Sequence, residues 1–118
     1  MVSIAVVDDD VAILDAMTLL AESRGWLAKV FASGEAFLDA FEHDRDIDCL
    51  VLDPHLQGIG GDDVALALAD TGVPIVGLTA RPESPVTQSI LESGAAAILT
   101  KPVRPAELVS AIENLLLN

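Results

Sequence analysis

The chain is short, apolar and acidic, and these properties exclude several classes of protein. Its 118 residues suffice for one domain with a hydrophobic core, and a hydrophobic fraction of 52% is too high for a disordered chain. The formal net charge of −13 repels phosphate backbones, so we expect no direct binding of DNA or RNA. No apolar run approaches the roughly 18 residues of a membrane span, and the N-terminus does not resemble a signal peptide. Together with the single cysteine, Cys49, this predicts a cytoplasmic protein without membrane contact.

Five short apolar runs are predicted to be β-strands. In chain order they cover residues 4–7, 27–31, 49–52, 75–78 and 96–99. None of them alternates cleanly between polar and apolar residues, which is typical of parallel strands buried on both faces. We therefore expect helices to cover both faces of all five.

Amphipathic stretches after the strands predict five helices. The first covers residues 11–24, the second follows an N-cap at Ser33, the third covers residues 62–70, the fourth follows an N-cap at Ser84, and the fifth begins at Pro105. A serine at such a position can accept a hydrogen bond from a free N–H of the first helical turn. Strand and helix thus alternate five times, which predicts an α/β fold with a parallel sheet and right-handed crossovers.

Polar residues gather where the predicted strands end. After the first, third, fourth and fifth strands come Asp8 and Asp9, then Asp53, then Thr79 with Ala80 and Arg81, then Lys101. The carboxyl ends of parallel strands lie at one edge of the sheet, where such folds place their functional sites. We therefore expect these side chains to converge.

Carboxylates at this edge could hold a divalent cation. Mg²⁺ prefers oxygen ligands, and Asp8, Asp9 and Asp53 could supply them, which would relieve the repulsion between neighbouring acids. A carboxylate beside Mg²⁺ can also act as a nucleophile and form an aspartyl phosphate. The ammonium group of Lys101 and the hydroxyl group of Thr79 could then neutralise and bind the phosphoryl oxygens.

Each residue taken alone also has an ordinary structural interpretation. An aspartate after a strand often caps a helix, which would account for Asp9 or Asp10, and a threonine such as Thr79 is common in turns. The acidic surface could simply confer solubility. If the site exists, the backbone N–H groups of His55 and Ala80 would complete it.

The chain resembles the receiver domain of bacterial two-component response regulators. The similar motifs are VVDDD at 6–10, LVLD at 50–53, LTA at 78–80 and LTKP at 99–102, and the segment SGEAFL at 33–38 is similar to FixJ-type receivers. The resemblance covers residues 3–117. It implies a single receiver domain over residues 1–118, with a doubly wound, flavodoxin-like sheet in the strand order 2-1-3-4-5.

The resemblance also implies a role for each site residue. Asp53 would accept a phosphoryl group from a sensor histidine kinase or a phosphotransfer protein, and the Mg²⁺ ligands would be Asp8, Asp9, Asp53 and the backbone carbonyl of His55. The phosphoryl group would be bound by Thr79, Ala80 and Lys101, with a cis peptide bond between Lys101 and Pro102. The chemistry would be limited to phosphorylation and dephosphorylation of the domain itself. The output would be a changed face on the fourth helix, fifth strand and fifth helix, which could also bind a second copy of the chain.

Several positions differ from the family pattern. Pro54 directly follows the acceptor, Gln57 stands where a proline is usual, and Ile98 replaces an aromatic residue that moves during switching. We expect the loop to tolerate Pro54, because the acceptor before it is already extended. His55 is either a solvated loop histidine or, together with Arg81, a group that sets the lifetime of the phosphoryl group. Arg81 could instead pair with Glu83 or be solvated.

Three rival functions remain open from the sequence. The differences from the family pattern would suit an interaction module that works without phosphorylation, whereas the complete set of site residues argues against it. A hydrolase with Asp53 as nucleophile would need a substrate pocket or cap domain, for which the chain is short. A flavin protein would need a phosphate-binding loop after the first strand, where the sequence has acids instead.

Overall fold

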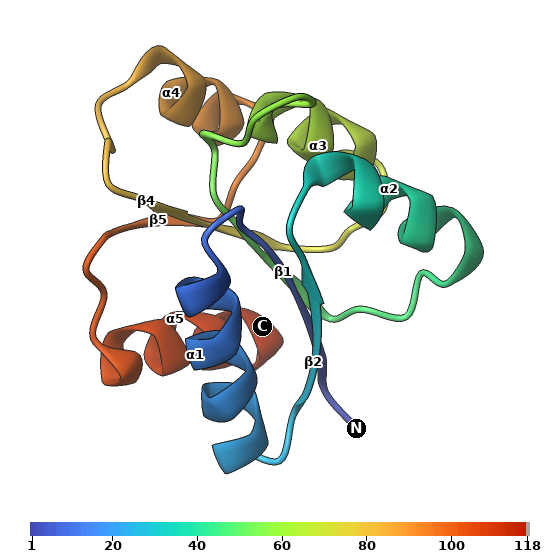
Figure 1. Cartoon of the computed structure of the whole chain (residues 1–118), viewed down its shortest axis with the longest axis vertical. Helices are drawn as coiled ribbons and strands as arrows, with labels where there is room; N and C mark the ends of the chain where they lie inside the picture. Colours follow the sequence, from blue (N-terminus) through green and yellow to red (C-terminus); the bar gives the residue numbers. More distant parts are fainter. Residues whose placement is uncertain (118) are drawn as a thin grey trace.

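The computed structural model describes residues 1–117 and shows five strands alternating with five helices (Figure 1). The elements are β1 (Ser3–Val7), α1 (Val11–Ser23), β2 (Leu27–Phe31), α2 (Gly34–His43), β3 (Cys49–Leu52), α3 (Gly61–Leu68), β4 (Ile75–Thr79), α4 (Pro85–Glu92), β5 (Ala97–Thr100) and α5 (Pro105–Leu117). All the predicted elements are confirmed, with ends shifted by one or two residues. The sheet is parallel, and its order β2-β1-β3-β4-β5 confirms the predicted order.

The strand register brings the ends of the central strands together. Val7 at the end of β1 pairs with Leu52 at the end of β3. Further along the same sheet, Thr79 at the end of β4 pairs with Thr100 at the end of β5. The residues that follow β1 and β3 therefore leave the sheet side by side.

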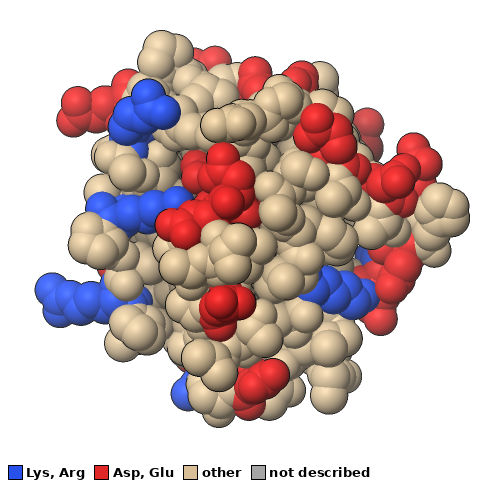
Figure 2. Space-filling view, viewed as in Figure 1, with Lys and Arg blue, Asp and Glu red and all other residues tan. Residues whose placement is uncertain are grey.

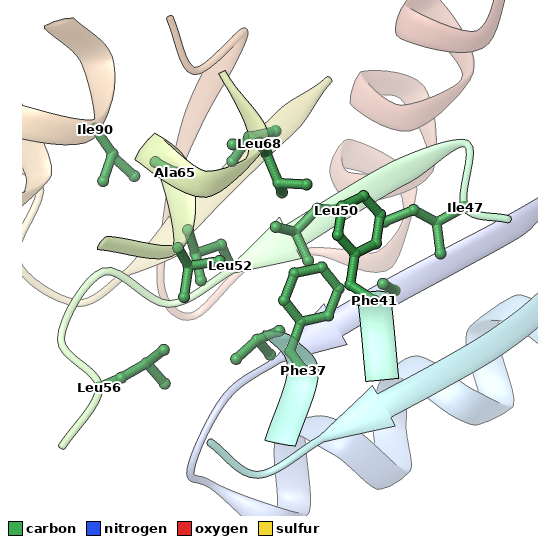
Figure 3. Packing of buried hydrophobic residues seen from close by; sticks show 13 residues of the cluster. Phe37, Phe41, Ile47, Leu50, Leu52, Leu56, Ala65, Leu68 and Ile90 are labelled. Carbon is green, nitrogen blue, oxygen red and sulfur yellow. The ribbon is translucent and has the colours of Figure 1, made fainter. Parts of the chain in front are cut away.

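Two hydrophobic clusters hold the helices against the sheet. One lies under α2, α3 and α4, where the rings of Phe37 and Phe41 stack with centroids 5.5 Å apart (Figure 3). The other lies under α1 and α5 and includes Met17 and Leu108. In Figure 1, α1 and α5 occupy one side of the sheet and the other three helices the opposite side. The carboxyl ends of the strands, where the polar residues lie, are therefore bordered by loops that lead to helices on both faces of the sheet.

The expectation that all five strands are buried on both faces is wrong for β2 and β5. Every residue of β1, β3 and β4 is buried, whereas Leu27 and Val30 of β2 remain 45% and 40% exposed. The residues of β5 are half-buried or exposed. Both are edge strands with a neighbouring strand on one side only, so the helices that pack on the sheet cover them incompletely.

Side-chain caps begin several helices. Ser33 accepts the N–H of Ala36 at the start of α2, and Ser84 accepts the N–H of Thr87 in the first turn of α4, as predicted. The cap of α1 is Asp10. Asp9 is therefore not used as a cap.

Within residues 1–117, no helix is long and apolar enough to cross a membrane.

Candidate functional site

Two neighbouring strands present a pair of buried carboxylates. Asp8 follows β1 and is 1% exposed, while Asp53 follows β3 and is 8% exposed. The backbone N–H of Asp53 donates to the carbonyl of Val7 at 3.0 Å, which extends the hydrogen bonding between β1 and β3 to Asp53. Each carboxylate accepts a backbone N–H from two residues further on, Asp8 Oδ1 from Asp10 and Asp53 Oδ1 from His55, both at 2.9 Å. The orientation of both carboxylates is therefore set by the backbone.

Lys101 joins the two carboxylates. Its Nζ donates to Asp8 Oδ2 at 2.8 Å and to Asp53 Oδ2 at 3.3 Å. Its backbone N–H donates to the carbonyl of Thr79 at 2.8 Å, and the peptide bond between Lys101 and Pro102 is cis. The end of β5 thus delivers an ammonium group to acids that are 48 and 93 residues away in sequence.

Burial and charge act in opposite directions on this ion pair. Burial raises the pKa of Asp8, and the hydrogen bond from Lys101 offsets this effect only in part. Burial lowers the pKa of Lys101, but the hydrogen bond to Asp8 and the charges of Asp53 and Asp8 outweigh it, so the pKa of the lysine is raised. Lys101 therefore remains an ammonium group, and additional positive charge nearby would further stabilise the ionised form of the buried Asp8.

The three acids that follow the strands fit a magnesium site. Asp8, Asp9 and Asp53 each place one carboxylate oxygen so that all three lie within 4.8 Å of one another. All are hard oxygen donors, and Asp9 is exposed, so the group opens to solvent on its side. A carboxylate has about four lone-pair sites, so Asp8 can bind a cation and keep its hydrogen bonds.

A second set of polar side chains adjoins the acids. Thr79 is the last residue of β4 and is fully buried, and its Oγ1 lies 3.1 Å from His55 Nδ1. The same Oγ1 accepts the backbone N–H of Arg81 at 2.9 Å. His55 Nε2 lies 2.7 Å from Ser84 Oγ, at the start of α4. The site thus extends from the acids to the N-terminal cap of a helix.

The comparison with known proteins identifies the family. Residues 4–113 match the response regulator receiver domain. The chain belongs to this family. The receiver is 39% identical over 110 residues to the DNA-binding response regulator MtrA of Mycobacterium tuberculosis, a match that covers 92% of this chain and 48% of MtrA. It is 35% identical over 115 residues to the response regulator protein TmoT of Ectopseudomonas mendocina, covering 96% of this chain and 52% of TmoT. The chain therefore spans about half the length of these curated relatives.

Solved receiver structures share the fold. A CheY-like receiver domain from Methanospirillum hungatei superposes with a TM-score of 0.92 at 25% identity, covering 98% of this chain and 94% of that chain. A receiver protein from Burkholderia phymatum gives 0.88 at 31% identity, covering 98% and 95%. Full-length FixJ from B. japonicum gives 0.86 at 29% identity, covering 96% of this chain and 56% of FixJ. FixJ, to which the segment at 33–38 is similar, is thus among the structural relatives.

The interpretation of His55 as a solvated loop residue is wrong. Its side chain is only 16% exposed, because the loop after β3 folds the ring between Thr79 and Ser84. The backbone N–H of His55, expected to bind a phosphoryl group, donates to Asp53 Oδ1 in this structure. The sequence contained no local signal for the ring contacts, because their partners lie 24 and 29 residues away.

Arg81 takes part in the site mainly through its backbone. Its N–H donates to Thr79, and its carbonyl accepts the hydroxyl hydrogen of Thr87 at 2.9 Å. The residue is exposed, and in the described part of the receiver no ion pair joins it to Glu83. Ala80, between Thr79 and Arg81, is also exposed. The loop after β4 is therefore held from inside by hydroxyl groups.

The loop after Asp53 accommodates the unusual Pro54. Pro54 is buried, and its carbonyl accepts the N–H of Gly61 at 3.2 Å. A Cβ atom on Gly61 would lie 2.5 Å from the Pro54 Cα atom, so only glycine allows α3 to begin this close to the loop. Gln57, at the usual proline position, is exposed.

Ile98 packs where many receivers have an aromatic ring. It is half-buried on β5 and fills the space above Gly77, where a Cβ atom would overlap its Cδ1. The same Cβ atom would lie 3.0 Å from Cδ1 of Ile90 on α4. Ile98 therefore contributes to the packing of α4 on the sheet.

An apolar hollow adjoins the charged site on the α1 and α5 side. Its volume is about 480 Å³, and its lining includes Ile13, Met17, Leu20, Val103 and Leu108. Lys101 and Ala80 also line it, so the hollow borders the site directly. Exposed apolar surfaces of this kind, here beside Lys101 and Ala80, are typical of sites that bind protein partners.

Proposed function

We propose that this receiver domain accepts a phosphoryl group on Asp53 in a Mg²⁺-dependent reaction. The observation that carries the proposal is the position of Lys101 Nζ, within 3.3 Å of both Asp8 and Asp53. Receiver domains typically accept a phosphoryl group at such an acidic site, and the family assignment supports the same role here. The rival interaction module is less well supported, because the chain retains every charged group that the reaction needs.

The proposed reaction is a single phosphoryl transfer. A carboxylate oxygen of Asp53 attacks the phosphorus atom of a phosphohistidine on a donor protein, while the nitrogen–phosphorus bond breaks and the donor histidine keeps the electron pair and takes up a proton. Lys101 neutralises a phosphoryl oxygen, and the N–H of Ala80 and the hydroxyl of Thr79 complete its binding. Mg²⁺, bound by Asp8, Asp9, Asp53 and the carbonyl of His55, would supply further positive charge.

The same geometry supports a proposal for the donor and the output. We propose that a sensor histidine kinase or a phosphotransfer protein docks on α1 beside the apolar hollow, which opens next to the acceptor. The signal would leave through the face formed by α4, β5 and α5, because Thr79 and Lys101 lie at its edge. A second copy of the chain is a candidate partner at this face. We propose the cytoplasm as the place where the domain acts. Acidic side chains are spread over the surface in Figure 2, which argues against direct contact of this domain with DNA.

The lifetime of the phosphoryl group is a second property of the site. We propose that the His55 ring and the Arg81 side chain set it, because the ring contacts Thr79 Oγ1 and the charge of Arg81 acts on the ring. Timing hydrolysis in His55→Phe and Arg81→Ala proteins tests this, and unchanged lifetimes in both would refute it.

Intact-mass measurement tests the proposed reaction. The native chain incubated with acetyl phosphate and Mg²⁺ should gain the mass of one phosphoryl group, and chelation of the metal should prevent it. Asp53→Asn should abolish the gain, whereas Asp39→Asn, which changes an exposed acid on α2, should preserve it. Absence of labelling in the native chain, or equal labelling of Asp53→Asn, would refute the proposal.

A further inference from the structure

A chain of side-chain hydrogen bonds leads from the phosphoryl site to the start of α4. His55 lies in its middle, with Nδ1 3.1 Å from Thr79 Oγ1 and Nε2 2.7 Å from Ser84 Oγ. Ser84 Oγ lies 2.9 Å from Thr87 Oγ1 and accepts the backbone N–H of Thr87 at 3.3 Å. Thr79 and Thr87 at the two ends are fully buried. The two ends of this hydrogen-bond chain are therefore shielded from water and need partners within the protein, while His55 and Ser84 between them are partly exposed.

The far end of this hydrogen-bond chain sets the direction of its bonds from Thr87 to His55. The carbonyl oxygen of Arg81 can only accept, so the Thr87 hydroxyl donates its one hydrogen there. Thr87 Oγ1 must then accept the hydroxyl hydrogen of Ser84. Because that hydrogen is used, Ser84 Oγ can only accept from His55, and Nε2 of the ring must carry a hydrogen.

The same reasoning defines the state of Thr79. Because the bond to Ser84 needs the hydrogen on Nε2, an uncharged His55 ring carries none on Nδ1. A neutral imidazole with its hydrogen on Nε2 has a free lone pair on Nδ1, which accepts the hydroxyl hydrogen of Thr79. Thr79 therefore has no hydrogen left for a phosphoryl oxygen as long as it is bonded to His55.

We propose that His55 is a positioning residue that couples Thr79 to the N-terminal cap of α4. The inference rests on the proposed function, because the competing acceptor for the Thr79 hydrogen is a phosphoryl group on Asp53. When Thr79 donates to that group, Nδ1 of the partly buried ring loses its donor, and leaving an acceptor unpaired there is unfavourable. The ring then reorients, its bond to Ser84 breaks, and the first turn of α4 loosens.

The aliphatic packing of α4 cannot carry this polar exchange. Ile98 and Ile90 meet above Gly77 and have no hydrogen-bonding side-chain atoms. Ser84, by contrast, caps α4 by accepting the N–H of Thr87, and it also contacts the His55 ring that is hydrogen-bonded to Thr79. The polar chain thus provides a route to α4 in a receiver without an aromatic residue at position 98.

The tautomer of His55 is the first test, and it needs no variant. Nitrogen-15 NMR of the full chain at pH 8, without phosphodonor, should show the hydrogen on Nε2 and a free lone pair on Nδ1. A ring with its hydrogen on Nδ1 would overturn the proposal. This measurement remains decisive even if substitutions at position 55 prevent folding.

Amide hydrogen exchange at Thr87 is the second test. With acetyl phosphate and Mg²⁺ in excess, and phosphoryl uptake verified by intact mass on the same sample, exchange in the native chain should rise about fivefold, the factor expected for loss of an N-cap. In His55→Phe, which keeps the ring but cannot form the bonds, this response should be lost. Ser33→Ala removes a matched cap on α2, and the Thr87 response should persist in it.

The outcomes separate the coupling from the phosphorylation. A His55→Phe chain that takes up the phosphoryl group and still shows the rise at Thr87 would overturn the coupling and leave the proposed function intact. A native chain that takes up no phosphoryl group would overturn both. Uptake by both chains with a response in the native chain alone would establish the coupling.

Discussion

The two lysines of the receiver form ion pairs of very different character. Lys29 on the edge strand β2 lies 3.1 Å from Asp44 Oδ2, in the loop between α2 and β3. Lys101 after β5 lies 2.8 Å from Asp8 Oδ2 and 3.3 Å from Asp53 Oδ2. The side chain of Asp44 is 62% exposed and that of Asp8 only 2%. Similar distances therefore occur in water at one pair and inside the protein at the other.

This difference in burial decides what each acid can do. A backbone hydrogen bond from Asp46, followed by the contact with Lys29, lowers the pKa of Asp44, so this carboxylate is stable as it is. Burial raises the pKa of Asp8 despite its bond to Lys101, so Lys101 does not fully compensate the cost of burying this carboxylate. The buried acids at the sheet edge could therefore hold a cation, whereas the surface acid already has its countercharge.

Removing Lys101 should have the largest effect on stability. Lys101→Met leaves Asp8 and Asp53 buried without their ammonium partner, so the free energy of unfolding should fall by about 3 kcal/mol. Urea denaturation at neutral pH measures the loss, and Mg²⁺ should restore part of it because the cation replaces the missing charge. A loss no larger than that of Lys29→Met would break the comparison.

The two serine caps provide a second matched pair. Ser84 Oγ takes part in bonds with His55, Thr87 Oγ1 and the Thr87 N–H, whereas Ser33 Oγ accepts the backbone N–H of Ala36. Ser84→Ala should therefore cost about 2 kcal/mol and Ser33→Ala about 1 kcal/mol of unfolding free energy. Denaturant titrations of both variants test the order. Equal losses would mean that the hydrogen-bond chain adds nothing to the cap.

Cys49, the first residue of β3, is a buried ionisable group of a different kind. Within residues 1–117, the effects on its thiol are burial and the negative charge of Asp48, and no positive charge offsets them. Burial raises the pKa of its thiol to about 12, with a smaller contribution from the charge of Asp48. The thiol stabilises the fold fully below the pKa of an unfolded cysteine, and this contribution is lost as pH rises toward the folded pKa. Between pH 8 and pH 10 the native chain should lose about 1.4 kcal/mol more stability than Cys49→Ala. Identical pH profiles would show that the thiol ionises in the folded state.

Removing Lys29 should have the smallest effect. Lys29→Met breaks a pair that water already screens, so the melting temperature should fall slightly and the decrease should shrink in high salt. Because the folded pKa of Asp44 is lowered, its contribution is present above the unfolded pKa and is lost as pH falls through the folded value. Thermal unfolding at neutral and acidic pH measures both trends, and a salt-independent decrease would contradict the assignment of a screened pair.

The sequence by itself determined the elements and the edge of the sheet where the site lies. Short apolar runs and the caps Ser33 and Ser84 act within a few residues of chain, so they can be read without tertiary information. The alternation of strand and helix then places Asp8, Asp53 and Lys101 at one edge, because right-handed crossovers leave parallel strands few other arrangements.

Only the tertiary structure decided the exposure of the edge strands and the partners of His55. An apolar run looks the same whether its strand has one neighbour or two, so the runs by themselves did not distinguish the exposed edge strands β2 and β5 from β1. The bonds of His55 to Thr79 and Ser84 span 24 and 29 residues and depend on how two loops fold over each other. Local sequence encodes local energies, whereas the position of a ring between two loops depends on the packing of the whole sheet edge.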